Sequence, residues 1–284
     1  MTSFVAACVQ MRTGINPLEN LEVCEALIKD AAAEGATYIQ TPEMTNVLER
    51  SRKAQLAASN FEADDPFLER LGALAQELNV WLHIGSMAIR LEGERLANRG
   101  FLISPLGEIV ARYDKIHMFD VDLPNGESWR ESESYSAGGV SPVIDMGAVK
   151  LGMAICYDIR QPAIFREQSK VGAQVLTAPA AFTKQTGEAH WHVLQRARAI
   201  ENGAFVVTAA QGGVHEDGRH TYGHSLMVDP WGQVIAELDH DEPGILIGEL
   251  DMAKVGEARQ RIPAIENARD FLVATVSVRG EMVS

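Results

Sequence analysis

The first half of the chain alternates short apolar segments with longer amphipathic ones, which is the pattern of an α/β protein. Apolar segments that suit strands lie at residues 3–10, 37–40 and 80–87. The stretches between them carry helix-start signals: Asn16 opens one helix, and Asp64 and Asp65 start another. Pro66 falls in the first turn of the second helix, where its missing N–H is harmless. We therefore predict the order β-α-β-α-β for this part of the chain.

The second half follows the same order. Helix-forming sequence begins near Gln161 and near Glu188. The apolar segments before, between and after these helices are KLGMAIC, AQVLTAP and AFVVTAAQ. The pattern predicts a second β-α-β-α-β unit.

Each half then continues into two apolar segments joined by Pro-x-Gly, namely FLISPLGEIVARY and SLMVDPWGQVIAEL. Proline and glycine at these positions suit a type I turn, so both segments are predicted to be β-hairpins. Because the whole order occurs twice, we infer an internal pseudo-repeat with two similar sheets packed face to face and helices outside. No linker rich in proline or serine interrupts the chain, so we predict a single domain over residues 1–284.

Charge and cysteine content narrow the functional classes. The formal net charge is −14 with no compensating basic stripe, which argues against nucleic acid as a partner. The three cysteines are too few and odd in number for a disulfide framework. The N-terminal MTSFVAACVQ suits a first strand rather than a signal peptide, and no apolar run is long enough to cross a membrane. We expect a cytoplasmic protein that acts on neither nucleic acid nor membranes.

Cys156 is the first candidate for chemistry. It lies where the apolar KLGMAIC segment passes into helix-forming sequence, and a nucleophile at such a turn is held rigidly. The N–H of Tyr157 could then point at a developing oxyanion. A buried structural cysteine is the alternative from this segment alone. Cys8 and Cys24 lie inside a predicted strand and helix, where the structural interpretation is favoured.

Glu43 and Lys115 are candidates for activating that thiol and stabilising charge. Glu43 follows a strand and a proline, at the edge where α/β sheets build their sites. Lys115 follows a predicted strand and precedes apolar residues, so its ammonium could be partly desolvated. Taken singly, an exposed loop glutamate and a solvated lysine remain the alternatives, and the neighbouring Asp114 weakens the case for Lys115.

Three segments together carry a resemblance to a known family. Pro-Glu after a strand, YDKIHMFDVD and GMAICYDIR occur in that order. They resemble the nitrilase superfamily of carbon–nitrogen hydrolases, which use a Glu-Lys-Cys triad. The resemblance extends through YGHSLMVDPWGQVIAE and is closest to the branch of ω-amidases and deaminated-glutathione amidases.

The resemblance assigns a role to each matching residue. It implies that Glu43 is the general base, Lys115 the oxyanion stabiliser and Cys156 the nucleophile. A second glutamate is typical of the family, and Glu131 in WRESESYSAGG matches it, with Glu133 and Glu127 as nearby rivals. The implied fold is a four-layer α-β-β-α sandwich, usually assembled as a homodimer or larger. The implied reaction hydrolyses a small carboxylate-bearing amide through a thioester, releases ammonia and requires no cofactor or metal.

Substrate-binding residues are less specifically marked. Arg160 could pair with a substrate carboxylate or form a salt bridge to Asp158 or Glu167. Tyr157, Phe182 and Thr183 are expected in the pocket wall. The run Gln161-Pro162-Ala163 departs from the family's frequent Phe-Pro-Glu, which leaves the triad untouched but bears on the substrate.

Other motifs do not favour a different chemistry. His190 and His192 are two residues apart on a predicted helix, unlike a zinc-binding pair, so no metal site is expected. The glycine-rich GGVHEDGRHTYGH does not join a strand to a helix, and we interpret it as a flexible surface loop. The remaining alternatives are an N-carbamoyl amidase, aliphatic amidase or nitrilase of the same superfamily, and a non-catalytic binding protein on this fold.

Overall fold

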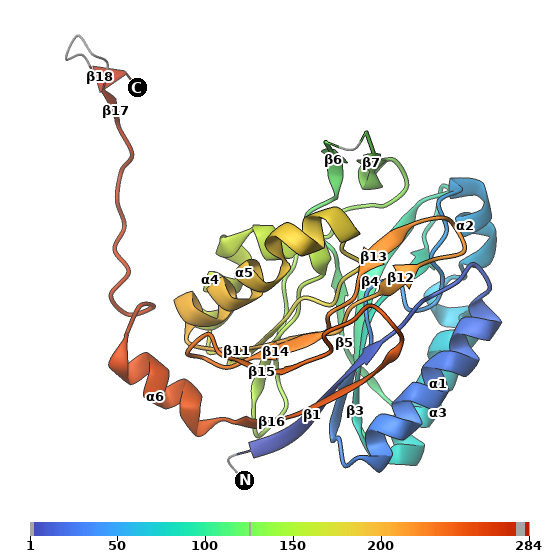
Figure 1. Ribbon diagram of the computed structural model, residues 1–284, viewed down its shortest axis with the longest axis horizontal. Coiled ribbons are helices and arrows are strands. Elements are labelled where there is room, and N and C mark those ends of the chain that lie inside the picture. Colours follow the sequence, from blue (N-terminus) through green and yellow to red (C-terminus); the bar gives the residue numbers. More distant parts are fainter. Residues whose placement is uncertain (1–2, 125, 277–281, 284) are drawn as a thin grey trace.

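The computed structural model describes residues 3–124, 126–276 and 282–283. Two six-stranded sheets form its centre (Figure 1). In spatial order, the first sheet contains β16 (Gly244–Asp251), β1 (Ser3–Gln10), β2 (Tyr38–Gln40), β3 (Trp81–Arg90), β4 (Leu96–Ile103) and β5 (Ile109–Asp114). The second contains β8 (Val143–Asp145), β9 (Lys150–Gly152), β10 (Val175–Thr177), β11 (Phe205–Thr208), β14 (Leu226–Val228) and β15 (Val234–Glu237).

The two sheets share one topology. Starting from β16 in the first sheet, successive neighbours pair antiparallel, parallel, parallel, antiparallel and antiparallel. Starting from β8 in the second sheet, the same sequence of pairings occurs. The internal pseudo-repeat predicted from the element order is thus confirmed, with β1 corresponding to β9 and β5 to β15.

Helices cover the outer faces of the sheets. The helices α1 (Pro17–Ala33) and α3 (Pro66–Leu78) pack beside the first sheet, and α4 (Pro162–Lys170) and α5 (Lys184–Asn202) lie over the second (Figure 1). As expected, α1 and α3 begin after a capping residue: the side chains of Asn16 and Asp65 accept hydrogen bonds from the first-turn N–H groups. The result is the expected α-β-β-α sandwich.

The hairpin turns form as the Pro-x-Gly pattern predicts. Gly107 donates its N–H to the carbonyl of Ser104 at 2.9 Å, and Gly232 donates to that of Asp229 at 2.8 Å. Both glycines have positive φ angles, +79° and +84°, which a residue with a side chain rarely adopts. These two turns fix the register of β4 with β5 and of β14 with β15.

Several element boundaries differ from the sequence-based prediction. The helix expected from Glu188 begins at Lys184, because the side chain of Thr183 caps it by accepting from the N–H of Thr186. The strand expected through Cys156 ends at Gly152. Strands that were not predicted include β8 and β16, which begin the two sheets, as well as β6 (Asp120–Asp122), β7 (Ser128–Arg130), β17 (Thr275–Val276) and β18 (Met282–Val283). The unpredicted helices are α2 (Arg52–Ala58), α6 (Ala253–Arg261) and the 3-10 helices η1 (Glu62–Asp64), η2 (Glu131–Glu133) and η3 (Cys156–Arg160).

The prediction of a flexible surface loop at GGVHEDGRHTYGH was wrong. This segment forms an antiparallel hairpin of β12 (Gly212–Val214) and β13 (His220–Tyr222). Its side chains are anchored inside the protein: the buried His215 contacts the carbonyl of Thr13 at 2.9 Å and the hydroxyl of Thr221 at 2.6 Å. Glycine content suggested mobility, but buried hydrogen bonds over long sequence separations hold the hairpin.

Beyond α6 the chain leaves the body of the molecule. It extends to the short strands β17 (Thr275–Val276) and β18 (Met282–Val283), far from both sheets (Figure 1). No helix in the described part of the chain has the length and apolar character needed to cross a bilayer.

Candidate active site

A cavity of about 380 Å³ collects the side chains singled out from the sequence. Glu43 enters it from just beyond β2, Lys115 from just beyond β5, and Cys156 from the start of η3, after β9. The structure therefore brings three segments that are far apart in sequence to one place. Glu131, from η2, lines the same cavity.

Cys156 occupies a strained turn. Its φ angle is +47°, a left-handed conformation that is uncommon for a residue other than glycine. Its N–H donates to the carbonyl of Pro179 at 3.0 Å, which ties the turn to the segment after β10. Such a turn presents the side chain to the cavity, as in a nucleophile elbow. Cys8 and Cys24 are fully buried and do not line this cavity, in agreement with a structural role.

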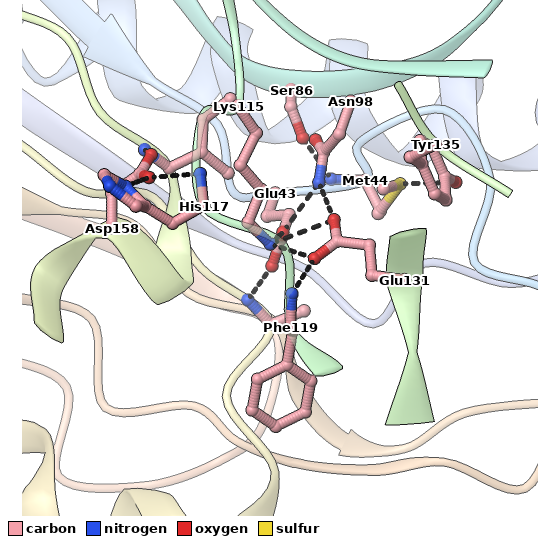
Figure 2. Close-up of polar contacts among 12 residues, drawn as sticks. Glu43, Met44, Ser86, Asn98, Lys115, His117, Phe119, Glu131, Tyr135 and Asp158 are labelled. Atoms are coloured by element: carbon pink, nitrogen blue, oxygen red, sulfur yellow. Dashed lines mark hydrogen bonds and ion pairs between the residues drawn. The ribbon is translucent and has the colours of Figure 1, made fainter. Parts of the chain in front are cut away.

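Lys115 is enclosed by two carboxylates (Figure 2). Its Nζ atom lies 2.9 Å from Oε1 of Glu43 and 2.8 Å from Oε2 of Glu131, and its side chain is only 2% exposed. A buried ammonium is tolerated only when it is paired in this way. The neighbouring Asp114 does not compete, because it pairs with Arg99 at 2.6 Å.

Asn98, which the sequence analysis missed, joins the two carboxylates. Its Nδ2 atom donates to Oε1 of Glu43 at 2.9 Å and to Oε1 of Glu131 at 3.0 Å. We call Glu43, Asn98, Lys115 and Glu131 the charged cluster. A polar residue inside the apolar strand LANRGFLI was the signal that could have identified Asn98.

Backbone N–H groups hold the outer oxygens of the same carboxylates. Phe119 donates its N–H to Oε2 of Glu131 at 2.7 Å (Figure 2). Ala181 donates its N–H to Oε2 of Glu43 at 2.8 Å. Both glutamates are thus fixed on both oxygens. The orientation of Glu43 depends on the second half of the chain, since Ala181 follows β10.

The electrostatics of the site favour an ionised Glu43 beside a neutral thiol. Burial raises the pKa of Glu43, but the charge of the Lys115 ammonium and the hydrogen bonds from Cys156, Lys115 and Asn98 together outweigh burial and lower the pKa. Burial would lower the pKa of Lys115, yet the charges of Glu131 and Glu43 hold it well above its ordinary value. Burial and the nearby Glu43 charge raise the pKa of Cys156 well above normal, and its thiol hydrogen-bonds to Glu43. A carboxylate base is therefore positioned against a protonated nucleophile.

A second buried carboxylate ties the lysine segment to the cysteine segment. Asp158 is fully buried and accepts hydrogen bonds from the hydroxyl of Tyr113 at 2.6 Å and from the N–H of Ile155 at 2.9 Å. It also accepts from the N–H of His117 at 3.1 Å and contacts the ring of that residue (Figure 2). These bonds fix the chain on either side of Lys115 relative to Cys156.

Arg160 lines the cavity without a carboxylate partner in the described chain. The salt bridges considered from the sequence are not formed, because Asp158 is engaged as above and Glu167 pairs with Lys170. The guanidinium instead lies 3.2 Å from the His190 ring and 5.2 Å from the centre of the Phe182 ring.

The other residues expected in the wall, Tyr157, Phe182 and Thr183, also line the cavity. The hydroxyl of Thr183 is occupied by capping α5 and by contact with the hydroxyl of Thr186 at 2.8 Å. Of the rival glutamates, Glu133 makes no contact with Lys115, and Glu127 accepts from the indole N–H of Trp129 at 3.2 Å. Glu131 is thus the second glutamate that reaches the lysine.

Similarity to known proteins agrees with this geometry. The family described as carbon-nitrogen hydrolase matches residues 5–260. A Synechocystis protein (strain PCC 6803 / GT-S) named deaminated glutathione amidase is 38% identical, over 94% of this chain and 98% of its own.

Two solved structures extend the comparison. The NitFhit protein of C. elegans superposes with a TM-score of 0.89 at 33% identity, covering 95% of this chain and 66% of its own longer chain. A glutamate-to-glutamine variant of the Nesterenkonia sp. AN1 amidase has a TM-score of 0.78 at 25% identity, covering 94% of each chain. Its active-site cysteine carries a covalently added acetamide moiety. Family match, sequence identity and fold agree, and the chain belongs to the carbon–nitrogen hydrolase family of amide-hydrolysing enzymes.

Proposed function

We propose that this enzyme cleaves a small carboxylate-bearing amide with Cys156 as nucleophile, Glu43 as general base and Lys115 as oxyanion stabiliser. The observation that carries the proposal is the convergence of these three side chains, from three distant segments, in one cavity. A carboxylate, an ammonium and a thiol at hydrogen-bonding distance are the groups that acyl transfer to sulfur requires.

The first half-reaction begins with an ionised Glu43 beside a protonated Cys156. Glu43, already ionised, takes the proton of the Cys156 thiol as the sulfur attacks the amide carbon. The carbonyl oxygen becomes an oxyanion, which the Lys115 ammonium and the N–H of Tyr157 stabilise. Protonated Glu43 then gives its proton to the nitrogen, the C–N bond breaks, and ammonia or an amine leaves a thioester on Cys156.

The second half-reaction reverses these roles with water as the nucleophile. Glu43 takes a proton from water, which attacks the thioester carbon, and returns that proton to the departing sulfur. The acid product leaves and the thiol is restored. Glu131 does not transfer a proton in this scheme. It holds Lys115 in place, and it keeps the ammonium charged by adding a second negative charge beside it.

The substrate class is supported by Arg160. An arginine that lines the cavity and lacks a carboxylate partner in the described chain suits an anionic group on the substrate. The name of the Synechocystis relative, deaminated glutathione amidase, points to amides of this kind. We therefore place ω-amides of dicarboxylic acids and deaminated glutathione first, before carbamoyl amino acids, neutral aliphatic amides and nitriles.

A substrate panel tests this order. Release of ammonia or amine should be fastest from ω-amides of dicarboxylic acids and from deaminated glutathione, at equal concentrations of all substrates. Faster turnover of a carbamoyl amino acid or a nitrile would move the enzyme to another branch of the family. Binding without turnover of any member would indicate a non-catalytic protein.

We also propose that the chain acts in the cytoplasm as one domain that assembles into a homodimer or larger. Three unpaired cysteines suit a reducing compartment, and pairing of β1 with β16 links the two ends of the fold. Assembly is supported by the extension after α6, where Phe271, Leu272 and Val273 are 81%, 98% and 86% exposed. Light scattering should give a mass of at least two chains, and changing these three residues to serine should lower it.

A further inference from the structure

The cavity is rich in arginine although the protein is acidic. Five arginines line it, Arg50, Arg52, Arg130, Arg160 and Arg219, in a chain with net charge −14. Three of the five have partners in the protein: Arg130 pairs with Asp122 at 2.8 Å, Arg52 donates to a backbone carbonyl at 3.2 Å, and Arg219 pairs along one edge with Asp217 at 3.0 Å. Arg160 belongs to the proposed acyl-binding side. Arg50 and Arg219 remain to be explained.

Arg50 and Arg219 meet at one aromatic ring. Their Cζ atoms lie 4.6 Å and 4.7 Å from the ring centre of Trp129. Two guanidiniums on one indole are each attracted by the ring but repel one another, and an anion between them would offset that repulsion. In the described chain Arg50 has no ion pair, so no protein carboxylate makes this compensation for it.

Arg219 is pre-oriented for a ligand. Asp217, whose side chain is 1% exposed, accepts from Nε and Nη2 of Arg219 at 3.1 Å and 3.0 Å. These contacts use one edge of the guanidinium and leave the Nη1 hydrogens available. An arginine held by a buried carboxylate loses little conformational freedom when it binds, which strengthens an added contact.

A row of aromatic rings connects this place to the nucleophile. Tyr157, the residue after Cys156, packs edge-on against Phe119 with ring centres 5.3 Å apart. Phe119 in turn lies 6.4 Å from Trp129. All three line the same cavity, so a ligand with its amide carbon at Cys156 can extend along them to the two arginines. Glu49 and Glu133 also line the cavity, so an anion would be favoured only where the guanidiniums face it.

We propose that Arg50 and Arg219, held at Trp129, bind a second carboxylate carried by the amine part of the substrate. The inference rests on the proposed function and extends it: Arg160 takes the acid group of the acyl part, and the pair at Trp129 takes that of the leaving amine. Of the substrates placed first above, deaminated glutathione carries both carboxylates and would make both contacts, whereas unsubstituted ω-amides lack the second.

Binding to an inactive enzyme tests this without depending on turnover. In the Cys156→Ala variant, calorimetry compares N-glutarylglycylglycine with its C-terminal amide, which differs only in the second carboxylate. The diacid should bind about 10-fold or more tightly, the range expected for hydrogen bonds to a charged group. Adding Arg219→Ala should abolish this preference. Adding Arg50→Ala should reduce it by about 2- to 5-fold, because Arg50 is exposed.

A matched control separates charge in the cavity from charge in general. Arg261 also lies over a tryptophan, 6.0 Å from the Trp231 ring, but outside the cavity. Adding Arg261→Ala should leave the preference for the diacid unchanged. If Arg219→Ala fails to fold, Arg219→Gln removes the charge while keeping a hydrogen-bond donor toward Asp217.

The outcomes distinguish this inference from the proposed function. Equal binding of diacid and amide, or a preference that survives both arginine variants, overturns the second carboxylate site. Ammonia release from glutaramate by the wild-type enzyme tests the proposed function separately. Loss of glutaramate turnover in Arg219→Ala equal to the loss on the diacid would also overturn the inference, because the arginine would then support the whole site.

Discussion

Two buried polar clusters lie at the junction of the sheets, and they differ in charge. The charged cluster surrounds Lys115 at the cavity. The second consists of three fully buried glutamines, Gln10, Gln40 and Gln211, which we call the glutamine cluster. Gln40 accepts from the N–H of Ala209 at 2.7 Å, so it joins the first sheet to the second.

The glutamine cluster supports the charged one from behind. Gln211 accepts from the N–H of Thr13 at 3.0 Å and donates to the carbonyl of Glu43 at 3.0 Å. Gln10 accepts from the N–H of Ser225 at 2.9 Å. Neutral amides can satisfy backbone groups on both sheets without the desolvation penalty of a charge. The difference teaches that neutral groups join the two sheets at the glutamine cluster, while the carboxylates paired with the buried ammonium gather at the cavity.

Removing the nucleophile should have the largest effect. Cys156→Ala should lower kcat by about 10⁴-fold or more, because the thioester can no longer form. The fold should survive, since Glu43 loses only the thiol and keeps its hydrogen bonds with Asn98, Lys115 and the N–H of Ala181. Amide turnover measures kcat, and circular dichroism measures whether the fold survives. Cys8→Ala and Cys24→Ala should retain activity, and full turnover by Cys156→Ala would end the proposed mechanism.

Removing the base should cause the second-largest loss of kcat. Glu43→Gln keeps the shape of the side chain but loses the base, so kcat should fall by about 10²- to 10⁴-fold, the usual contribution of general base catalysis. Lys115 would still be paired with Glu131, so unfolding temperature should change little. Glu133→Gln is the matched control and should change kcat by less than about 3-fold. A comparable loss in both variants would argue against a specific role for Glu43.

Changing Arg160 tests whether charge at the cavity also contributes to substrate binding. Arg160→Ala should raise KM for ω-amides of dicarboxylic acids by about 10- to 150-fold, the range for hydrogen bonds to a charged group, with a smaller change in kcat. Arg160→Lys should recover only part of this, because it keeps the charge and loses the planar fork. Steady-state kinetics on anionic and neutral amides measure the effect. Equal losses on both would make Arg160 structural.

Substitutions in the glutamine cluster should lower the free energy of unfolding more than they lower kcat. Gln40→Leu leaves the buried N–H of Ala209 without its acceptor, so the free energy of unfolding should fall by about 1–3 kcal/mol. The kcat of the folded enzyme should remain within about 3-fold of the wild type, which thermal denaturation and kinetics together show. Gln211→Leu is expected to lower both the free energy of unfolding and kcat, since Gln211 also holds the backbone of Glu43. A catalytic loss in Gln40→Leu without loss of stability would contradict the division between the clusters.

The smallest effect is expected from pH. The pKa of Cys156 is raised, so its thiol stays protonated between pH 7 and pH 9 and its attack depends on proton removal by Glu43, which is ionised over this whole range because its pKa is lowered. The rate of inactivation by iodoacetamide should therefore change by less than about 3-fold over that range. A free thiol of ordinary pKa would react roughly 20-fold faster at the upper end. A steep rise near pH 8.5 would mean that Cys156 titrates like an exposed cysteine.

The local pattern of the chain was sufficient for much of the fold. Alternation of apolar and amphipathic segments gave the order of elements, and Asn16, Asp65 and the Pro-x-Gly turns marked boundaries that the structure shares. These features act over a few residues, so sequence records them directly. The hairpin of β12 and β13 was missed because His215 anchors it to the carbonyl of Thr13, 202 residues away, and that partner is not apparent from local sequence.

The sequence by itself determined which groups are available: one cysteine at a strand-to-helix turn, one glutamate after a strand and one lysine before an apolar loop. Tertiary structure alone decided their states. The pKa of Glu43 depends on Lys115, 72 residues away, and its orientation depends on Ala181, 138 residues away. Asn98 acquires a role only because β4 places it between two glutamates. Charge and hydrogen bonding act through space at a few ångströms, so the reactivity of these residues is set when the two sheets pack together.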